Sequence, residues 1–369
     1  GTGSTENIRS MTGIRTGNVR PPAGRRRRGR RIRKLRRIGL GAGIAAAAVF
    51  AAVSWNLYRE RKATEAEIAA RSLQAETAGE AQGPDVIQYQ GKTYRRNTYV
   101  KAVLCLGVDR EGSMTEETTP GFGGQADGIF LAAQDTARNR IKVLMIPRDT
   151  MTEITMTDLS GNVLGKDTHH LTLAYTYGNG RETSCEYVKE AVSGLLGGLE
   201  IDYYLAADLD AIGILNDAVG GVRVTIDVDG LEEQDPELKK GATVTLTGEQ
   251  AEKFVRYRDT GKDHSALYRM DQQQEYLIGF FEAAKARASA DQDLAADLFE
   301  QMEDYMVTDL SKDQYLKLAM DALETEGLGE ENFYTVPGTG VTTARYDEFY
   351  ADEEALMPLV LEMFYREAE

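Results

Sequence analysis

The feature that most constrains the fold of this chain is an apolar segment near its N-terminus. Residues 38–58, IGLGAGIAAAAVFAAVSWNLY, are 21 consecutive uncharged residues between Arg37 and Arg59. A helix needs about 20 predominantly apolar residues to cross the hydrocarbon core of a bilayer. The sequence therefore predicts a transmembrane helix over residues 38–58, preceded by a basic arm, residues 1–37.

Charge is distributed very unevenly along the chain. Residues 1–62 carry sixteen Lys and Arg and two Glu, a net charge of +14, whereas the whole chain has a net charge of −16, so residues 63–369 carry −30. Thirteen basic residues precede the apolar segment, and only Arg59, Arg61 and Lys62 follow it closely. Because basic flanks stay on the cytoplasmic side of a membrane, we expect residues 1–37 in the cytoplasm. The sequence therefore predicts a single-pass protein of the cell membrane with its C-terminal part outside the cell.

The N-terminal region allows two other interpretations. The Ala-rich segment offers small-residue cleavage sites, as in a signal peptide, but 37 residues before it are long for one. The basic arm could bind nucleic acid. Beside a membrane span, however, such an arm is explained by topology and by contact with anionic lipid. We therefore expect the membrane, and no nucleic acid, as its partner.

The outer part of the chain divides into a predicted stalk or linker, residues 59–96, and a folded domain, residues 97–369. Apolar runs predict strands at Tyr99–Leu106, Gly128–Ala133, Ile141–Ile146, Tyr203–Ala207, Val222–Val228 and Phe333–Val336. Helical periodicity predicts helices at Ser184–Leu196, Leu209–Val219, Asp271–Ala288, Asp291–Tyr305, Lys312–Leu323 and Glu353–Tyr365. Strands that alternate with helices indicate an α/β fold, with a central mixed sheet covered by helices on both faces.

Three arginines lie close together in the segment 254–277, FVRYRDTGKDHSALYRMDQQQEYL. Arg256 and Arg258 alternate in what resembles a strand end, which would put their side chains on one face. Arg269 is expected near the start of a helix. Guanidinium groups beside a helix start form a receptor for phosphate oxygens. The alternative is three surface arginines, each paired with a nearby acid.

Three further loops at predicted strand ends carry polar side chains. They are LGVDR at 106–110, QADG at 125–128 and IPRDT at 146–150. Ligands of open α/β sheets gather at strand ends. Asp109 and Asp127 could hold a hard divalent ion through oxygen, and Arg148 would add a cation. Each motif alone is weak, because an Asp at a strand end is usually a turn residue.

The two cysteines, Cys105 and Cys185, do not make a disulfide framework, and Cys105 is expected as a buried free thiol. His and Cys residues show no metal-binding spacing.

Taken in order, these motifs resemble the LytR-CpsA-Psr family. The resemblance rests on LGVD, AD before an apolar strand, IPRDT, DYY, NDAVGGVRV, LTGEQAEKFVRYR and RMDQQQ, and extends from about Tyr99 to VPGTG and the C-terminal ADEEALMPLVLEMFY. It implies a membrane-anchored phosphotransferase. Such an enzyme moves a glycopolymer, teichoic acid or capsule-like, from an undecaprenyl-pyrophosphate carrier onto a peptidoglycan hydroxyl, with Mg²⁺ or Mn²⁺.

The resemblance also assigns residues. Asp109 and Asp127 match the metal carboxylates of the family, and Gln273 matches a nearby glutamine. The pyrophosphate-binding arginines would be Arg148, Arg256, Arg258 and Arg269. Asp149, Asp109 or a metal-bound water could accept the proton of the acceptor hydroxyl.

The chain departs from the family at Gln125 and Gln272, where arginines are usual. The loss of two positive charges leaves a second interpretation open, a prenyl-lipid binder or scaffold without turnover. A hydrolase that uses water as the acceptor is a third, and transcriptional regulation has only the basic arm in its favour. The apolar stretch Tyr276–Ala284 could line a slot for the prenyl tail, or it could be ordinary core.

Overall fold

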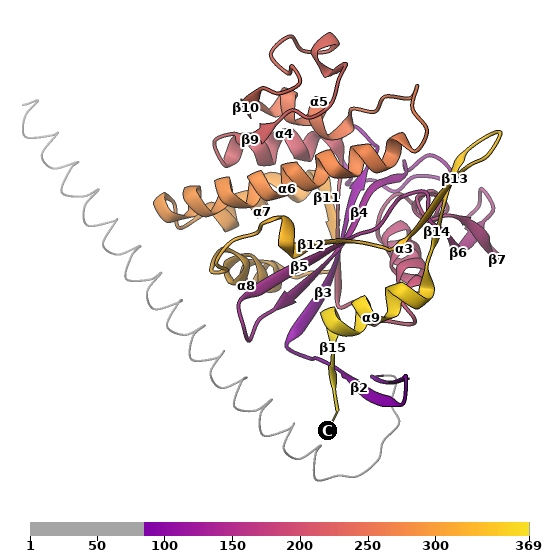
Figure 1. Ribbon diagram of the computed structural model, residues 1–369. Helices are drawn as coiled ribbons and strands as arrows, with labels where there is room; N and C mark the ends of the chain where they lie inside the picture. The colour runs from indigo at the N-terminus through magenta and orange to yellow at the C-terminus, as the bar shows by residue number, and fades with distance from the viewer. Residues whose placement is uncertain (1–84, 369) are drawn as a thin grey trace, which may run out of the picture. The chain divides into compact units, whose positions relative to one another are not determined.

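Six strands form the central sheet of the computed structural model, which describes residues 85–368 (Figure 1). In order across the sheet they are β11 (Met306–Thr308), β8 (Tyr203–Ala207), β3 (Val100–Val108), β4 (Ala126–Asp135), β5 (Arg140–Met145) and β12 (Phe333–Thr335). β3 is parallel to β8 and β5 is parallel to β12, whereas the other neighbours are antiparallel. The predicted mixed sheet is thus confirmed.

Helices cover both faces of this sheet. They are α2 (Leu173–Thr176), α3 (Glu182–Leu195), α4 (Leu209–Ala218), α5 (Gly248–Arg256), α6 (Ser265–Ala290), α7 (Leu294–Met302), α8 (Lys312–Leu323) and α9 (Glu353–Phe364). Alternate residues of β3, such as Leu104 and Leu106, are buried in one core with α3 and α9. On the opposite face, Val143 and Met145 of β5 pack against Met270 of α6, the long orange helix of Figure 1.

Four smaller sheets surround the central one. They are β1 (Val86–Tyr89), β2 (Lys92–Arg96) and β15 (Tyr365–Glu367); β6 (Met151–Thr157) and β7 (Val163–His170); β9 (Val222–Thr225) and β10 (Thr243–Leu246); and β13 (Gly338–Thr342) and β14 (Asp347–Ala351). Three short 3₁₀ helices are η1 (Leu231–Glu233), η2 (Glu303–Tyr305) and η3 (Glu330–Asn332). The predicted strand at Val222–Val228 exists, but it pairs with β10 instead of joining the central sheet. One edge strand of the central sheet is β11, which was not predicted because three residues are too few for a periodicity to show in the sequence.

The last part of the segment predicted as a stalk, residues 86–96, belongs to the folded structure. β1 and β2 form a hairpin whose two-residue turn, Gln90–Gly91, has positive φ at both positions, the geometry that suits the twist of antiparallel strands. β2 also pairs with β15, so this hairpin is tied to the end of the chain.

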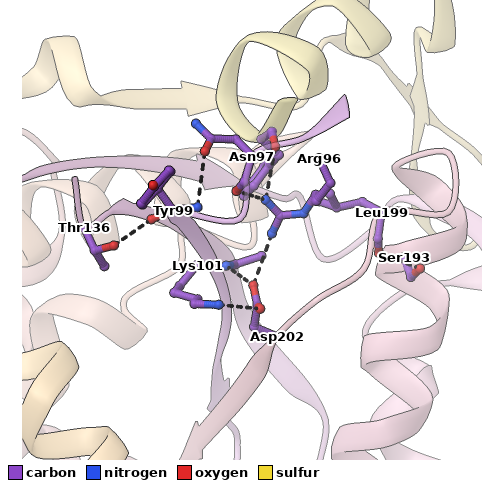
Figure 2. A network of polar contacts seen from close by, with 10 residues as sticks. Arg96, Asn97, Tyr99, Lys101, Thr136, Ser193, Leu199 and Asp202 are labelled. Atoms are coloured by element: carbon purple, nitrogen blue, oxygen red, sulfur yellow. Dashed lines mark hydrogen bonds and ion pairs between the residues drawn. The ribbon is translucent and has the colours of Figure 1, made fainter. Parts of the chain in front are cut away.

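A buried ion pair fixes the start of the domain (Figure 2). Arg96 Nη2 lies 3.1 Å from Asp202 Oδ2, and Arg96 Nη1 donates to the backbone oxygens of Asn97 and Phe364. Asp202 also accepts from the backbone N–H of Ala102 and from Lys101. This network joins β2, β3, the loop before β8 and the end of α9, which are distant in the sequence.

Among the described residues, no helix is both long enough and apolar enough to span a bilayer. The predicted transmembrane helix at 38–58 and the basic arm lie outside the residues that the structure describes, as do residues 59–84 of the predicted stalk.

Candidate active site

Asp127 lies at a bulge where β3 and β4 end side by side. Gly107 pairs with Gly128, but the next residue, Val108, pairs with Ala126. Asp127 therefore has no partner in the ladder. A bulge turns a side chain away from the regular alternation of its strand, and bulges are common beside active sites. The side chain of Gln273 lies across Gly128, where an added Cβ atom would be 3.6 Å from its amide. The bulge thus places Asp127 against α6.

Two arginines share the Asp127 carboxylate. Arg148 donates to Oδ1 of Asp127, and Arg269 Nη1 lies 2.9 Å from Oδ2. Arg269 Nη2 is also 3.5 Å from the backbone oxygen of Asp127. We refer to Asp127, Arg148 and Arg269 as the Asp127 cluster. It joins residues from β4, the loop after β5, and α6.

The Asp127 cluster holds buried, excess positive charge. Only 9% of the Arg269 side chain is exposed. Burial lowers the pKa of Arg269; the Asp127 carboxylate opposes this shift, while Arg148 and Arg258 add to it. Arg148 also lies near Asp149, so three arginines, Arg148, Arg258 and Arg269, face two carboxylates at this site, and their remaining N–H donors can bind an anion.

Gln125 and Asp149 complete the surroundings of Arg148. Gln125 Oε1 accepts from Arg148 Nη2 at 2.9 Å. Arg148 Nε is buried without a hydrogen bond and lies 3.4 Å from Asp149 Oδ1. The turn is set by Thr150, whose N–H and hydroxyl both donate to the backbone oxygen of Pro147. Gln125 therefore orients Arg148, where the family usually has another arginine.

The predicted strand end at Arg256 and Arg258 is wrong, because Arg256 is the last residue of helix α5. The sequence does contain the signal for this helix: Thr247 and Gln250 form a capping box at its start. At its end, Gln272 donates to the backbone oxygen of Tyr257, and Gln273 donates to that of Val255, 3.5 Å away. Two of the glutamines in the QQQ run thus bind backbone oxygens at the end of α5.

The two arginines after Val255 have different surroundings. Arg258 Nε donates to Ser265 Oγ at 2.6 Å, and its charge acts on Arg269, so Arg258 borders the Asp127 cluster. Arg256 is 46% exposed and lies 3.9 Å from Asp109 and 3.7 Å from Glu111. For Arg256 the structure therefore shows an arginine paired with local acids, the alternative that the sequence left open. Ser265 and Glu111 were not singled out in the sequence.

The sequence predicts two metal-binding carboxylates, Asp109 and Asp127. The described residues contain no group of three or more His, Cys, Asp or Glu side chains that could hold a metal ion without a further ligand. Asp109 is 53% exposed at the end of β3. Both Asp127 oxygens accept from arginines, but each carboxylate oxygen has a second lone pair. Mg²⁺ usually takes one or two protein carboxylates and completes its shell with phosphate oxygens and water. Asp109 and Asp127 are the residues that would hold such an ion together with a bound phosphate.

An apolar cavity of about 250 Å³ lies between the sheet and the helices on the α6 face. Phe280, Phe281 and Ala284 of α6 line it, together with Leu205 of β8 and side chains of α7 and α8. Tyr276 instead packs in the core around β9 and β10. The stretch Tyr276–Ala284 therefore serves partly as cavity wall and partly as ordinary core. Cys105 and Cys185 are free thiols, and burial raises the pKa of Cys105 to about 12.

The chain is similar to a known family and to several of its members. The LytR_cpsA_psr family model matches residues 60–362. The chain is 29% identical over 179 residues to the polyisoprenyl-teichoic acid–peptidoglycan teichoic acid transferase TagU of Bacillus cereus, covering 48% of this chain and 51% of TagU. It is 27% identical over 205 residues to the transferase of the same description, TagV, of Bacillus subtilis, covering 52% and 47%. The matches thus span about half the length of these relatives.

The crystal structure of B. subtilis TagV has a similar fold, with a TM-score of 0.54 at 19% identity over 72% of this chain and 98% of TagV. A family match across most of the chain, together with the shared fold, establishes the relationship: the chain belongs to the LytR-CpsA-Psr family.

Proposed function

We propose that this protein is a membrane-anchored phosphotransferase that moves a glycopolymer from an undecaprenyl-pyrophosphate carrier onto peptidoglycan. The observation that carries the proposal is the Asp127 cluster, in which two largely buried arginines share one carboxylate at the strand ends. Such excess positive charge suits the phosphates of the donor. The names of the family relatives support the same class of reaction, with a polyisoprenyl-linked teichoic acid as donor.

The chemistry follows from this charge. The acceptor hydroxyl attacks the phosphorus atom next to the polymer and gives its proton to Asp149, Asp109 or a bound water, while prenyl phosphate leaves with the electrons of the broken P–O bond. Arg148, Arg269 and Arg258 would stabilise the charge that grows on the phosphate oxygens. One preorganised donor of this kind contributes roughly 3 kcal/mol to the transition state. Mg²⁺, held by Asp109 and Asp127 with the phosphates, would supply further charge stabilisation.

The apolar cavity beside α6 is proposed as the site of the prenyl chain. It is lined almost entirely by apolar side chains and lies next to the helix that carries Arg269. Each methylene that leaves water stabilises binding by about 0.8 kcal/mol. The cavity could therefore select prenyl phosphates over small phosphates.

Membrane anchoring through residues 38–58, with the C-terminal part outside the cell, is part of the proposal. It rests on the apolar segment and on the charge difference across it. Protease added to intact protoplasts should remove the C-terminal part and leave an N-terminal tag protected. A protected C-terminus would contradict this topology.

The direct test uses the full chain in detergent. It is incubated with a polyprenyl-pyrophosphate-linked saccharide, Mg²⁺ and peptidoglycan fragments, and release of prenyl phosphate is followed. Release that depends on the fragments, with saccharide appearing on them, is the expected result. Release without any acceptor would instead identify a hydrolase.

Gln125 favours one second candidate, a prenyl-lipid binder without turnover. Here Gln125 accepts a hydrogen bond from Arg148, whereas the family usually carries a positive charge at this position. If the wild type binds the donor but releases no prenyl phosphate, and Gln125→Arg releases it, the binder is correct and the proposed transferase activity is not.

A further inference from the structure

A polar groove lies on the side of α6 next to the Asp127 cluster. It consists of two adjoining cavities of about 510 and 410 Å³, which share Asp227, Val228, Tyr268, Asp271 and Gln272. Volumes of this size are typical of sites for small ligands. Arg258 and Ser265 line one of the two cavities. The groove therefore extends from the edge of the proposed phosphate site.

One face of α6 forms the wall of this groove. Tyr268, Asp271, Gln272 and Glu275 recur at spacings of three and four residues, so they share one side of the helix. Arg269 lies on the adjoining side, toward Asp127. The first turns of α6 thus contribute residues both to the Asp127 cluster and to the groove.

Gln272 lines the groove and carries one buried polar atom without a hydrogen-bond partner. Only 6% of this residue is exposed, yet its Oε1 atom is buried without a hydrogen bond. Its Nε2 atom donates to the backbone oxygen of Tyr257 at 3.2 Å, which fixes the amide and leaves Oε1 as an acceptor. A buried acceptor without a partner is destabilising, so Oε1 is suited to a hydroxyl or N–H donor from a ligand.

Tyr268 is the exposed aromatic side chain of the groove, which Val228, Phe254 and Ile278 also line. It is 56% exposed, although it is a large aromatic residue on a helix whose neighbours at positions 269 and 270 are buried. Large aromatic side chains offer a flat apolar face together with a polar hydroxyl. An aromatic face beside fixed polar groups matches the alternating C–H and O–H surfaces of a sugar ring.

The charge of the groove argues against a polyanion. Its acidic side chains include Asp227, Asp271 and Glu275, and its lysines are already paired: Lys240 with Asp229 at 2.7 Å and Lys262 with Asp259 at 3.3 Å. A phosphate-rich polymer would be repelled by these carboxylates. A neutral glycan with hydroxyl and acetamide donors would not.

We propose that this groove binds a neutral amino-sugar glycan, with one ring against Tyr268 and a donor group bound to Gln272 Oε1. This inference rests on the proposed function, in which the glycan is the acceptor. One hydroxyl group of the glycan would then point toward Arg258 and the donor phosphates. The donor and acceptor subsites then share the start of α6.

The test uses the full chain in detergent and tetra-N-acetylchitotetraose, a neutral amino-sugar chain, as the probe. Calorimetry measures the dissociation constant of the probe and, separately, that of a polyprenyl-pyrophosphate-linked saccharide. Tyr268→Ala is expected to weaken probe binding about tenfold, the effect of losing one aromatic contact, whereas Tyr268→Phe keeps it. Tyr346→Ala is the matched control, because Tyr346 is also exposed but lies in the β13–β14 hairpin. Donor affinity should stay the same in all three variants.

Gln272→Met tests the second contact. It removes the unpaired acceptor and also the N–H that donates to Tyr257, so thermal unfolding is measured to show that the protein is folded, while probe binding should weaken. In transfer assays, Tyr268→Ala should raise KM for peptidoglycan fragments and leave KM for the donor unchanged.

A wild type that binds and cleaves the donor lipid but does not bind the probe would overturn the glycan site and leave the transferase proposal intact. Unchanged probe affinity in both Tyr268→Ala and Gln272→Met would overturn it equally. If the probe binds and these variants weaken it, but no prenyl phosphate is released under any condition, the glycan site stands and the transferase proposal fails.

Discussion

Arg269 lies 2.9 Å from the Oδ2 atom of Asp127, a residue that precedes it by 142 positions in the chain. The contact joins α6 to the bulge in β4, and Arg148 binds the other oxygen of the same carboxylate. Asp127 thus holds two like charges side by side. Without it, the mutual repulsion of two buried guanidinium groups would separate them.

Arg269→Ala should reduce transfer by at least ~100-fold, because it removes one donor that stabilises phosphate charge, worth ~3 kcal/mol. Arg287→Ala is the control, since Arg287 is on the same helix but is exposed and paired with Asp291. Initial rates of prenyl phosphate release measure the effect, and circular dichroism checks folding. A folded Arg269→Ala protein with nearly full activity would show that this cluster is not the phosphate site.

Asp109→Asn should raise the Mg²⁺ concentration needed for half-maximal activity by at least about tenfold, because Asp109 and Asp127 would be the two protein ligands of the ion. Binding of Mn²⁺, followed by its paramagnetic resonance signal in the presence of the donor lipid, gives a readout independent of turnover. Glu300→Gln changes an exposed acid elsewhere and serves as the control. Activity that persists in excess chelator would exclude the metal role of Asp109 and Asp127.

Ala319→Phe should fill part of the apolar cavity and weaken binding of a long-chain donor by at least about tenfold, the equivalent of two buried methylenes. A donor with a short prenyl chain should bind almost as well as to the wild type. Ala286→Phe, on the exposed side of α6, is the matched control. Equal loss for long and short chains would place the prenyl tail elsewhere.

Asp202→Ala should lower the free energy of unfolding by about 3 kcal/mol, because it leaves the Arg96 guanidinium buried without its counter-charge. Glu367→Ala removes an exposed partner of Lys92 from the adjoining strand, and it should lower the free energy of unfolding far less than Asp202→Ala does. Denaturant titrations compare the two variants. Equal losses would mean that the network of Figure 2 does not anchor the start of the domain.

Asp208 gives the stability of the protein a specific pH dependence. Burial raises the pKa of this carboxyl from 3.8 to about 7. Between these two pH values Asp208 keeps its proton in the folded protein but releases it in the unfolded chain. The free energy of unfolding is therefore not reduced by Asp208 below pH 3.8, and it falls as the pH rises toward 7. Asp208→Asn keeps the side-chain oxygen that caps α4 but cannot ionise.

The Asn variant should thus gain stability relative to the wild type between pH 4 and pH 8, by on the order of 4 kcal/mol. Asp352→Asn, at the exposed N-cap of α9, should show no such gain. Thermal unfolding at both pH values tests this. A difference between the Asp208→Asn variant and the wild type that does not change with pH would contradict it.

The sequence predicted the elements whose pattern is local. Strand β8 and helix α8 have the predicted bounds, because each carries a complete apolar period within its own residues. α6 begins at Ser265, six residues before the predicted start, since its first turns are polar on the side of the groove. The ordered motifs identified the family, and Asp127, Arg148 and Arg269 were named before their contact was known.

Only the tertiary structure decided which of these residues meet. The sequence cannot show that Asp127 sits at a bulge, that it binds Arg148 and Arg269 at once, or that Arg256 turns toward Asp109 and Glu111 instead. The sequence equally cannot show that Gln272 lines the groove. Periodicity records which side of an element is buried, whereas a contact between distant residues depends on strand register and on how α5 and α6 pack together.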